Sequence, residues 1–314
     1  MQVMQATKNF EIIVDSTSDL DEYFRQTYDI RLLYSHFTVD GQEENACVDW
    51  SRITREEFYA ALKADPDRFK TAPPSVGEMA LCMEGIVTSG MGVLYLTISG
   101  SLSGTNDFAG KARAMVLDKY PDAKIVVVDT RRFGPAIGLM AVNASLLRAG
   151  GRTLEETAAI IEADKNRYHQ AGWLDDLSYV AKTGRLTNAK AFFGTLIGIK
   201  PIGEFDYNGL TTVLGKAKGE KAALDVLLAY VKATITDPEN QIIFIAQSNR
   251  LKQAEKYKVM IEEALHPKAV YVKDVYCACG INVGPGLMAA YYIGKEISSD
   301  LSVEKNILKD LIGG

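Results

Sequence analysis

The feature that most constrains this chain is the alternation of short apolar runs with amphipathic stretches through its first half. The runs at 10–15, 92–98 and 124–129 each have the length and composition of a buried strand, and each precedes a stretch with helical spacing. This alternation is typical of strand-helix-strand units, in which parallel strands form a sheet covered by helices. We therefore predict an α/β fold whose N-terminal part is a Rossmann-like parallel sheet with helices on both faces.

Another strand is predicted in this half, at 31–39, where an apolar run ends at the turn pair Asp40-Gly41. The second half of the chain has a different pattern. Two strand-like runs flank Asn208-Gly209, which is the strongest short sequence signal for a β-hairpin. Further strands are predicted at 241–247, 269–277 and 287–293, and a helical tail from Asp300.

The length of 314 residues suggests about two domains. We place the boundary near residue 170, which gives an N-terminal α/β domain at 1–170 and a C-terminal α/β domain at 171–314. The second domain is expected to hold a mixed sheet that includes the hairpin, followed by the helical tail. No long linker separates the two, so we expect the domains to pack closely.

Charge and hydropathy exclude several classes of protein. The chain has 35 basic and 40 acidic side chains, and a formal net charge of −5 does not favour nucleic-acid binding. No apolar run approaches the ~18 residues of a membrane-spanning helix. Residues 1–10 lack the charged-then-apolar pattern of a leader. We expect a cytoplasmic protein with no membrane span and no nucleic-acid partner.

The four cysteines and three histidines do not form a metal-binding or nucleophilic pattern. Cys277 and Cys279 are separated by one residue, and Cys47 and Cys82 stand alone, so no pair has the spacing of a zinc knuckle or a redox dithiol. The histidines lie in unrelated contexts, which does not favour a catalytic triad. We expect neither a metal site nor a cofactor.

Three hydroxyl-rich turns precede predicted helices, at 16–18, 70–75 and 99–105. Helix N-termini offer free N–H groups and a positive dipole end to an anion. The same residue types are also the preferred helix caps: Ser75, three residues before Glu78, fits a capping box, and Ser103 fits a cap as well. Hydroxyls without an adjacent base favour the binding of a carboxylate or phosphate over the activation of a nucleophile.

Two further polar residues have alternative interpretations. Arg185, between a helical stretch and Thr187-Asn188, is either a structural ion pair or a bidentate partner for an anion or another protein. Asn282, just before Gly284, is either an ordinary turn residue or a group that orients a ligand. The chain contains neither a phosphate-binding G-x-x-x-x-G-K-[ST] loop nor a G-x-S-x-G nucleophile elbow.

Six short motifs occur in the order in which they are found in the DegV family of fatty-acid-binding proteins. They are VDSTSDL at 14–20, TAPPS at 71–75, LSGT at 102–105, KTGRL at 182–186, GTLIGIKP at 194–201 and GPG at 284–286. No single motif is decisive, but their order is specific. The chain resembles this family over nearly its whole length, from about residue 10 to residue 297.

The resemblance implies two α/β domains with one long-chain fatty acid between them, and with its carboxylate held by hydroxyls near the ends of N-terminal strands. It implies a carrier rather than an enzyme, since a separate bacterial fatty acid kinase acts on the presented carboxylate. By position, Thr71, Ser99 and Ser101 would bind the carboxylate, and Arg185 would lie near the head group or the kinase interface. Ser16 and Asn282 are the other predicted ligand-binding residues.

The chain departs from the family pattern around the expected head group. Ala72 and Pro73 stand where the family usually has Ser-Gln, Gly100 replaces the second serine of a pair, and Asn282 replaces a histidine. Asparagine can donate a hydrogen bond but cannot carry charge. These departures bear on the identity of the ligand more than on the fold.

Two other functions remain open at this point. The first is a carrier whose altered site accepts a different anionic or polar small molecule. The second is an enzyme of phosphoryl or acyl transfer that uses the same turns, with Asp15 or Asp129 as acid or base. The shortage of histidines and the lack of a nucleotide-binding loop favour the fatty acid carrier over the enzyme.

Overall fold

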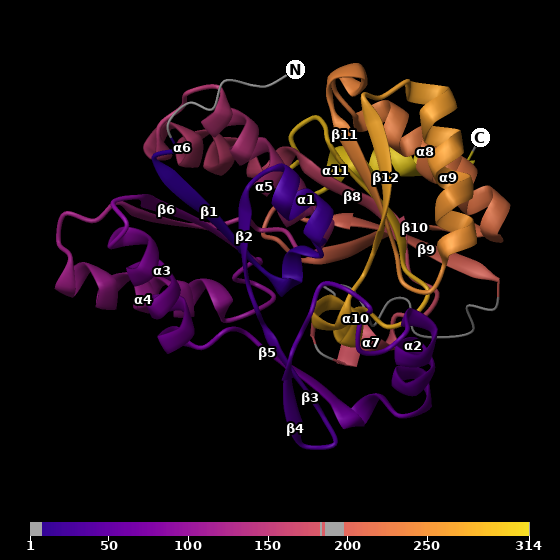
Figure 1. The fold of residues 1–314 in the computed structure, drawn as a ribbon. Helices are drawn as coiled ribbons and strands as arrows, with labels where there is room; N and C mark the ends of the chain where they lie inside the picture. The colour runs from indigo at the N-terminus through magenta and orange to yellow at the C-terminus, as the bar shows by residue number, and fades with distance from the viewer. Residues whose placement is uncertain (1–7, 183, 186–197, 314) are drawn as a thin grey trace.

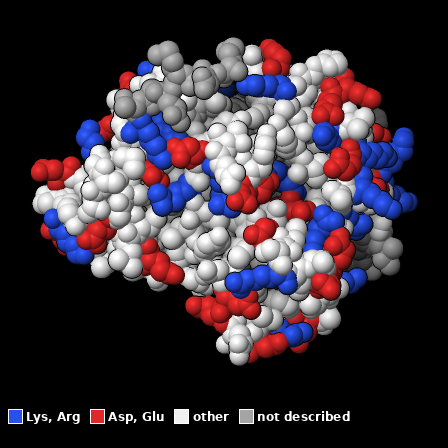
Figure 2. Space-filling model, in the orientation of Figure 1, with Lys and Arg blue, Asp and Glu red and all other residues white. Residues whose placement is uncertain are grey.

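The computed structural model describes residues 8–182, 184–185 and 198–313. Figure 1 shows two α/β lobes side by side, with a small sheet below them. Residues 194–197, the first half of the GTLIGIKP motif, lie outside the described residues, as do Thr183 and Leu186 of the KTGRL motif. Acidic and basic side chains are intermixed over the face drawn in Figure 2, in keeping with the small net charge.

The first lobe is built on a parallel four-stranded sheet in the order β2-β1-β6-β7. Its strands are β1 (Phe10–Asp15), β2 (Ile30–Leu33), β6 (Gly92–Thr97) and β7 (Ile125–Asp129). One face is covered by α3 (Val76–Val87) and α4 (Thr105–Lys119), and the other by α5 (Pro135–Ala149) and α6 (Leu154–Asp164).

Strand alternation explains why both faces are covered. On β1, Ile13 packs in the cluster that contains Met79 of α3, whereas Ile12 packs in the cluster that contains Met140 of α5. A strand that is apolar on both faces needs a helical layer on each. The predicted Rossmann-like sheet with helices on both faces is confirmed.

The second lobe holds a mixed six-stranded sheet in the order β10-β9-β8-β13-β11-β12. Its strands are β8 (Tyr168–Trp173), β9 (Ile199–Phe205), β10 (Thr211–Lys218), β11 (Ile242–Gln247), β12 (Ala269–Asp274) and β13 (Met288–Ile293). The antiparallel pair β9-β10 turns at Asn208-Gly209, which confirms the predicted hairpin. The predicted division at residue 170 falls within β8.

One face of this sheet packs against α8 (Glu220–Thr234), α9 (Leu251–Leu265) and α11 (Ser302–Gly313). The opposite face packs towards the first lobe, since Phe205 and Tyr291 belong to the same apolar cluster as the buried side of α5. No helix among the described residues is long and apolar enough to cross a membrane.

A small antiparallel sheet, in the order β4-β3-β5, lies below the lobes in Figure 1. It consists of β3 (His36–Val39), β4 (Gln42–Asn45) and β5 (Phe69–Ala72). The short helices near it are α2 (Arg55–Ala64), α7 (Ser178–Lys182) and α10 (Cys277–Val283), and α1 (Glu22–Thr27) lies between β1 and β2 in sequence. The Nε1 group of Trp50 donates to Asp274 over 2.7 Å, which ties this part of the chain to the second lobe.

Four local predictions were wrong. The predicted strand at 31–39 is two strands, because the Ser35 N–H is taken by Ser16 Oγ and not by a strand partner. The predicted turn at 70–75 is largely strand β5, which pairs with β3. The predicted strand at 269–277 ends at Asp274, and helix α10 follows. Ser103 is not the N-cap of α4, which is Gly104.

Candidate ligand-binding site

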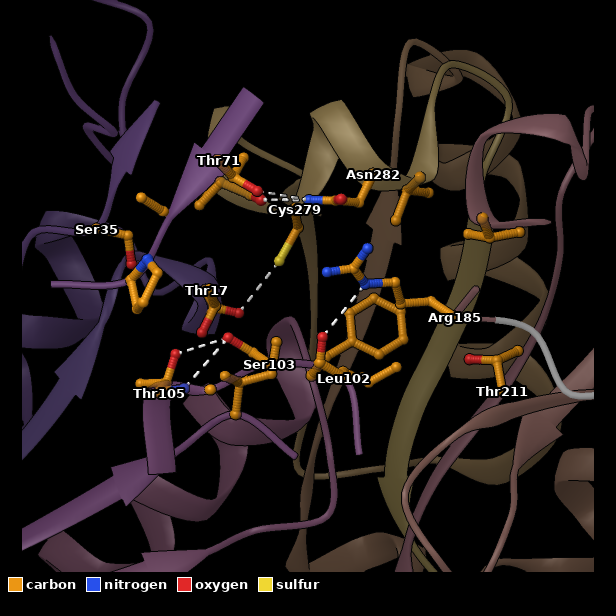
Figure 3. Close-up of a pocket in the computed structure, with 18 residues that line it drawn as sticks. Thr17, Ser35, Thr71, Leu102, Ser103, Thr105, Arg185, Thr211, Cys279 and Asn282 are labelled. Carbon is orange, nitrogen blue, oxygen red and sulfur yellow. Dashed lines mark hydrogen bonds between the residues drawn. The ribbon is translucent and has the colours of Figure 1, made fainter. Parts of the chain in front are cut away.

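A cavity of about 220 Å³ lies between the two lobes and the small sheet. Figure 3 shows Thr17, Ser35, Ser103 and Thr105 around one side of it and Arg185, Asn282 and Thr211 on the other. The hydroxyl-bearing residues that line it are Thr17, Ser35, Thr71, Ser103, Thr105 and Thr211. The remaining lining is largely apolar, so the cavity offers several hydrogen-bond donors within an otherwise nonpolar wall.

Thr17 reaches the cavity because β1 ends in a tight turn. Asp15 caps the short 3-10 turn at Ser16–Ser18 by accepting from the Thr17 N–H over 2.8 Å, and it also accepts from the Thr17 hydroxyl. Tyr95 donates to the other carboxylate oxygen over 3.3 Å. Burial raises the pKa of Asp15, against the opposing effect of these hydrogen bonds. Asp15 does not line the cavity, and its role in the fold is to hold the turn.

Ser35 lines the cavity and carries a buried hydroxyl, and the sequence prediction missed it. Its N–H donates to Ser16 Oγ over 3.0 Å, and its carbonyl accepts from the Ala46 N–H over 2.8 Å. Its Oγ lies near the Asp15 carboxyl but does not meet hydrogen-bond geometry with it or with any other described residue. The residue is only 2% exposed. A buried hydroxyl without a partner is rare in proteins, which makes Ser35 a candidate ligand-binding residue.

The loop before α4 brings a third set of donors to the cavity. Ser103 Oγ and Thr105 Oγ1 are 2.9 Å apart, and the Thr105 N–H donates to Ser103 Oγ over 3.3 Å. Gly104, the N-cap of α4, has no side chain to cap the helix. This 15-residue helix therefore begins at the cavity wall without a side-chain cap on its first turn. The positive end of the helix dipole favours an anion there.

Thr71 and Asn282 meet across the boundary between the small sheet and α10. Asn282 Nδ2 donates to Thr71 Oγ1 over 3.2 Å and to the Ala278 carbonyl over 3.3 Å. Both amide hydrogens are therefore engaged, while the Thr71 hydroxyl hydrogen is left to donate. Asn282 thus orients Thr71 and is not itself placed to donate to an anion.

Arg185 follows α7 and lies at the cavity wall. Its Nε donates to the Leu102 carbonyl over 3.2 Å, which links it to the loop before α4. In Figure 3 the guanidinium points towards the cavity. It is the one arginine or lysine among the described residues that line this cavity.

Three predicted ligand-binding residues do not line the cavity: Ser16, Ser99 and Ser101. Ser16 holds the Ser35 backbone, as described above. Ser99 Oγ accepts from the Ser101 N–H over 3.3 Å, and Ser101 Oγ donates to the Asn208 carbonyl over 2.8 Å. The two serines therefore join the first lobe to the hairpin turn. Of the predicted set, Thr71, Arg185 and Asn282 come together at the cavity.

The cavity wall contains no activated nucleophile among the described residues. The Cys279 thiol donates to the Thr17 carbonyl over 3.3 Å, and burial raises its pKa well above the usual value, so it stays protonated. Asp129 accepts from the Gly100 and Arg131 N–H groups at 3.1 and 3.0 Å and does not line the cavity. None of the histidines lines the cavity. No cluster of metal-ligating side chains occurs in the part of the chain that is described.

A second, smaller cavity of about 30 Å³ continues from the first. The two share Phe133, Val180, Thr211 and Val283 as lining residues. The rest of the second cavity is mostly apolar, with walls formed by Trp173, Leu174, Leu177, Pro201, Val213 and Leu287. Gly172 and Gly203 pair across β8 and β9 and also line it, so that no side chain rises from the sheet at that point. Together the cavities form a polar compartment followed by an apolar one.

Comparison with known proteins agrees with this architecture. The sequence model of the DegV family matches residues 9–295. A DegV domain-containing protein of Clostridium perfringens is 31% identical over 287 residues, which cover 91% of this chain and 98% of that protein.

Solved structures of the same family have the same fold. A fatty-acid-binding DegV family protein of Thermus thermophilus superposes with a TM-score of 0.82 at 25% identity, over 91% of this chain and 99% of that one. DegV of Bacillus subtilis, a fatty-acid-binding protein, superposes with a TM-score of 0.78 at 22% identity, over 92% and 100% of the two chains. The family that the six motifs predicted is confirmed: this chain belongs to the DegV family.

Proposed function

We propose that this protein is a cytoplasmic lipid carrier that binds one long-chain fatty acid, with the carboxylate in the first cavity and the acyl chain directed into the second. The observation that carries the proposal is the junction of the two cavities, one rich in hydrogen-bond donors and the other apolar. An amphipathic ligand with one anionic end and a long apolar end matches that order. The fatty acid binding of the Thermus thermophilus protein supports the same function here.

The carboxylate would be bound by donors from three elements. We assign the hydroxyls of Ser35 and Thr71 as its hydrogen-bond partners, with the N-terminal end of α4 and Arg185 supplying positive potential. Ser35 is the strongest of these assignments, because its buried hydroxyl has no hydrogen bond among the described residues. Ser16 and Asn282 act as positioning residues for Ser35 and Thr71. Ser99 and Ser101 support the site by holding the hairpin against the loop before α4.

The acyl chain would supply most of the affinity. Burial of about fifteen methylenes at ~0.8 kcal/mol each gives a gross ~12 kcal/mol, from which the costs of binding are subtracted. Each hydrogen bond to the charged carboxylate adds about 1.5–3 kcal/mol and fixes the orientation. The two cavities, of about 220 and 30 Å³, are together smaller than the roughly 300–1,000 Å³ of typical ligand pockets, and the second is too small for an acyl chain unless its walls move. We therefore expect Phe133 and Thr211, at the junction, to move apart as the chain enters.

The same geometry favours a carrier over an enzyme. The thiol of Cys279 is protonated, and the carboxyls of Asp15 and Asp129 lie behind the cavity wall. A bound carboxylate would need an external group to react with. We propose that a partner fatty acid kinase supplies that chemistry and that Arg185 contributes either to the head group or to the docking of this kinase.

The test is native mass spectrometry of the full chain purified from cells and, after lipid removal, of the chain mixed with octadecanoic acid. We expect one added mass of a long-chain fatty acid per chain in both experiments. A protein that stays empty after exposure to fatty acids of twelve to twenty carbons would overturn the proposal. Retention of a different anionic molecule in its place would favour a carrier of altered specificity.

A variant separates the two roles proposed for Arg185. For Arg185→Ala we expect weaker fatty acid binding or loss of phosphorylation by the kinase, measured by mass spectrometry and by acyl-phosphate formation. Lys182→Ala, three residues earlier, removes an exposed cation paired with Asp67 and serves as the charge-matched control. An Arg185→Ala protein that is normal in both measurements would leave Arg185 with a structural role alone.

A further inference from the structure

Gln170 places a polar side chain in the otherwise apolar second cavity. It lies on β8, and alternation along this strand puts Gln170 and Gly172 on the face of the sheet that points towards the first lobe. The residue is only 3% exposed, and it lines the cavity beside Trp173, Leu177 and Leu287. A glutamine is an unusual lining residue for a cavity that would hold only hydrocarbon.

One end of the Gln170 carboxamide is held in place. The hydroxyl of Tyr291, on β13, donates to Gln170 Oε1 over 3.0 Å. Burial raises the pKa of Tyr291 well above its usual value, so the phenol keeps its proton and remains a donor. This hydrogen bond fixes the carbonyl end of the amide and leaves the Nε2 end to the cavity.

The Nε2 end makes no hydrogen bond to the residues that the structure describes. Among the described residues, Tyr291 alone makes a hydrogen bond to the Gln170 side chain, and the other hydrogen bond of this residue uses its backbone N–H. An amide N–H that is open to a cavity takes its acceptor from whatever fills that cavity, because desolvation without an acceptor is costly. A saturated hydrocarbon chain in the cavity would offer none.

We propose that the ligand is a hydroxylated fatty acid, whose chain carries a hydroxyl oxygen that accepts a hydrogen bond from Gln170 Nε2 in the second cavity. The inference rests on the proposed fatty acid function and narrows the class of ligand. A site built to hydrogen-bond a polar group discriminates strongly against an analogue that lacks it, since the protein group is then left unpaired. Gln170 is then a specificity-determining residue for the chain, distinct from the hydroxyls that bind the carboxylate.

The experiment measures the affinity of the lipid-free full chain for octadecanoic acid and for its monohydroxy derivatives with the hydroxyl at each of carbons 6 to 12. Displacement of a fluorescent fatty acid gives all the values under one condition. We expect the affinity for at least one hydroxylated acid to exceed the affinity for octadecanoic acid by about tenfold or more. Its position along the chain would report how far Gln170 lies from the head group.

Variants assign the preference to the amide. Gln170→Met keeps the length of the side chain but removes the donor, and we expect it to bind octadecanoic acid more tightly and to lose the preference for the hydroxylated acid. Tyr291→Phe is the matched control, because it removes the same hydrogen bond and keeps the Nε2 group. If Gln170→Met alone folds poorly, the double variant with Tyr291→Phe avoids an unpaired tyrosine hydroxyl.

The outcomes separate this inference from the function on which it rests. Equal affinity of the wild-type chain for octadecanoic acid and every hydroxylated acid overturns the inference and leaves fatty acid binding intact. A preference that survives Gln170→Met also overturns it, as does a crystal structure of the octadecanoic acid complex with a water molecule bound to Nε2. Failure to bind any of these acids overturns both.

Discussion

The two cavities between the lobes are built in opposite ways. The first is lined by hydroxyls that come from the ends of elements, such as Thr17 after β1 and Thr105 at the start of α4. The second is lined mainly by side chains from the middle of the six-stranded sheet and from the residues around α7. Element ends have unpaired backbone groups and polar residues, whereas sheet faces are apolar. The fold thus places a polar compartment beside an apolar one, and the contribution of each to ligand binding can be tested separately.

The largest effect is expected where the two compartments join. Thr211→Trp places a bulky ring on a half-buried residue that lines both cavities. Exclusion of about four methylenes costs about 3 kcal/mol, which weakens binding of octadecanoic acid about 100-fold. Binding of hexanoic acid should change much less, because its chain ends near the junction. Isothermal titration with both acids measures the difference.

Lys218→Trp, at the exposed far end of the same strand β10, is the control for the added ring. It should bind both acids as the wild type does. If Thr211→Trp weakens the short and the long acid equally, the second cavity does not hold the chain.

The next effect tests the polar compartment. Ser35→Ala removes a hydroxyl that makes no hydrogen bond among the described residues, so the stability of the ligand-free protein should not fall. Loss of one hydrogen bond to a carboxylate weakens binding by roughly 10- to 100-fold. Thermal unfolding and ligand titration of the same preparation measure the two quantities.

Ser75→Ala is the matched serine variant, and it should behave in the opposite way. Ser75 is the N-cap of α3 in a capping box with Glu78, and its loss costs about 1 kcal/mol of stability. It does not line the cavity, so ligand affinity should stay the same. A drop in affinity for Ser75→Ala, with none for Ser35→Ala, would reverse our assignment of the two serines.

A smaller effect is expected for Thr71→Ala. Thr71 is exposed, and water can replace part of the hydrogen bond that it donates, so we expect octadecanoic acid to bind about threefold to tenfold more weakly. Thr71→Ser keeps the hydroxyl and should restore binding. Unchanged loading of Thr71→Ala, measured by native mass spectrometry, would remove Thr71 from the carboxylate site.

The smallest effect concerns stability alone and compares two buried carboxyls beneath the first cavity. Asp15 accepts several hydrogen bonds, whereas Asp19 Oδ1 accepts one from the Tyr276 N–H and Asp19 Oδ2 has no partner among the described residues. Burial raises the pKa of Asp19 well above its usual value. The folded state then binds the Asp19 proton more tightly than the unfolded state does. Protonation of Asp19 therefore stabilises the folded protein. This stabilisation is complete below the pKa of Asp19 in the unfolded chain and is lost as the pH rises through its pKa in the folded chain.

Asp19→Asn removes that titration. Urea unfolding at pH 5 and pH 8 should show a smaller loss of unfolding free energy with rising pH for Asp19→Asn than for the wild type. An unchanged pH dependence would mean that Asp19 is already charged in the folded protein.

The periodic pattern of apolar residues made the sheets predictable. The site depends on loops and strand ends, which have no such periodic pattern. The runs at 10–15 and 92–98 are apolar on both faces, and only a covered parallel sheet accommodates them. Asn208-Gly209 likewise specified the hairpin through its turn chemistry. These features act over a few residues, so the sequence displays them directly.

Ser35 shows why part of the site escaped prediction. Its position depends on a hydrogen bond to Ser16, nineteen residues earlier, which breaks an apparently continuous strand. The only local signal is a serine within an otherwise strand-like run. Ser99 and Ser101 show the converse, because a hydroxyl-rich loop that looked like a ligand site bonds to a hairpin more than a hundred residues later. Such contacts between distant segments have no local pattern.

The unpaired hydroxyl of Ser35 also bears on how long the protein survives in a cell. A ligand that binds only the folded chain adds stability in proportion to the logarithm of its concentration. A carrier whose buried donor is left without a partner when empty opens more often, and proteases act on opened chains. We therefore expect the cellular half-life of the carrier to lengthen when its cargo is plentiful and to shorten when it is scarce. Supply of the lipid would then set the abundance of the protein that carries it.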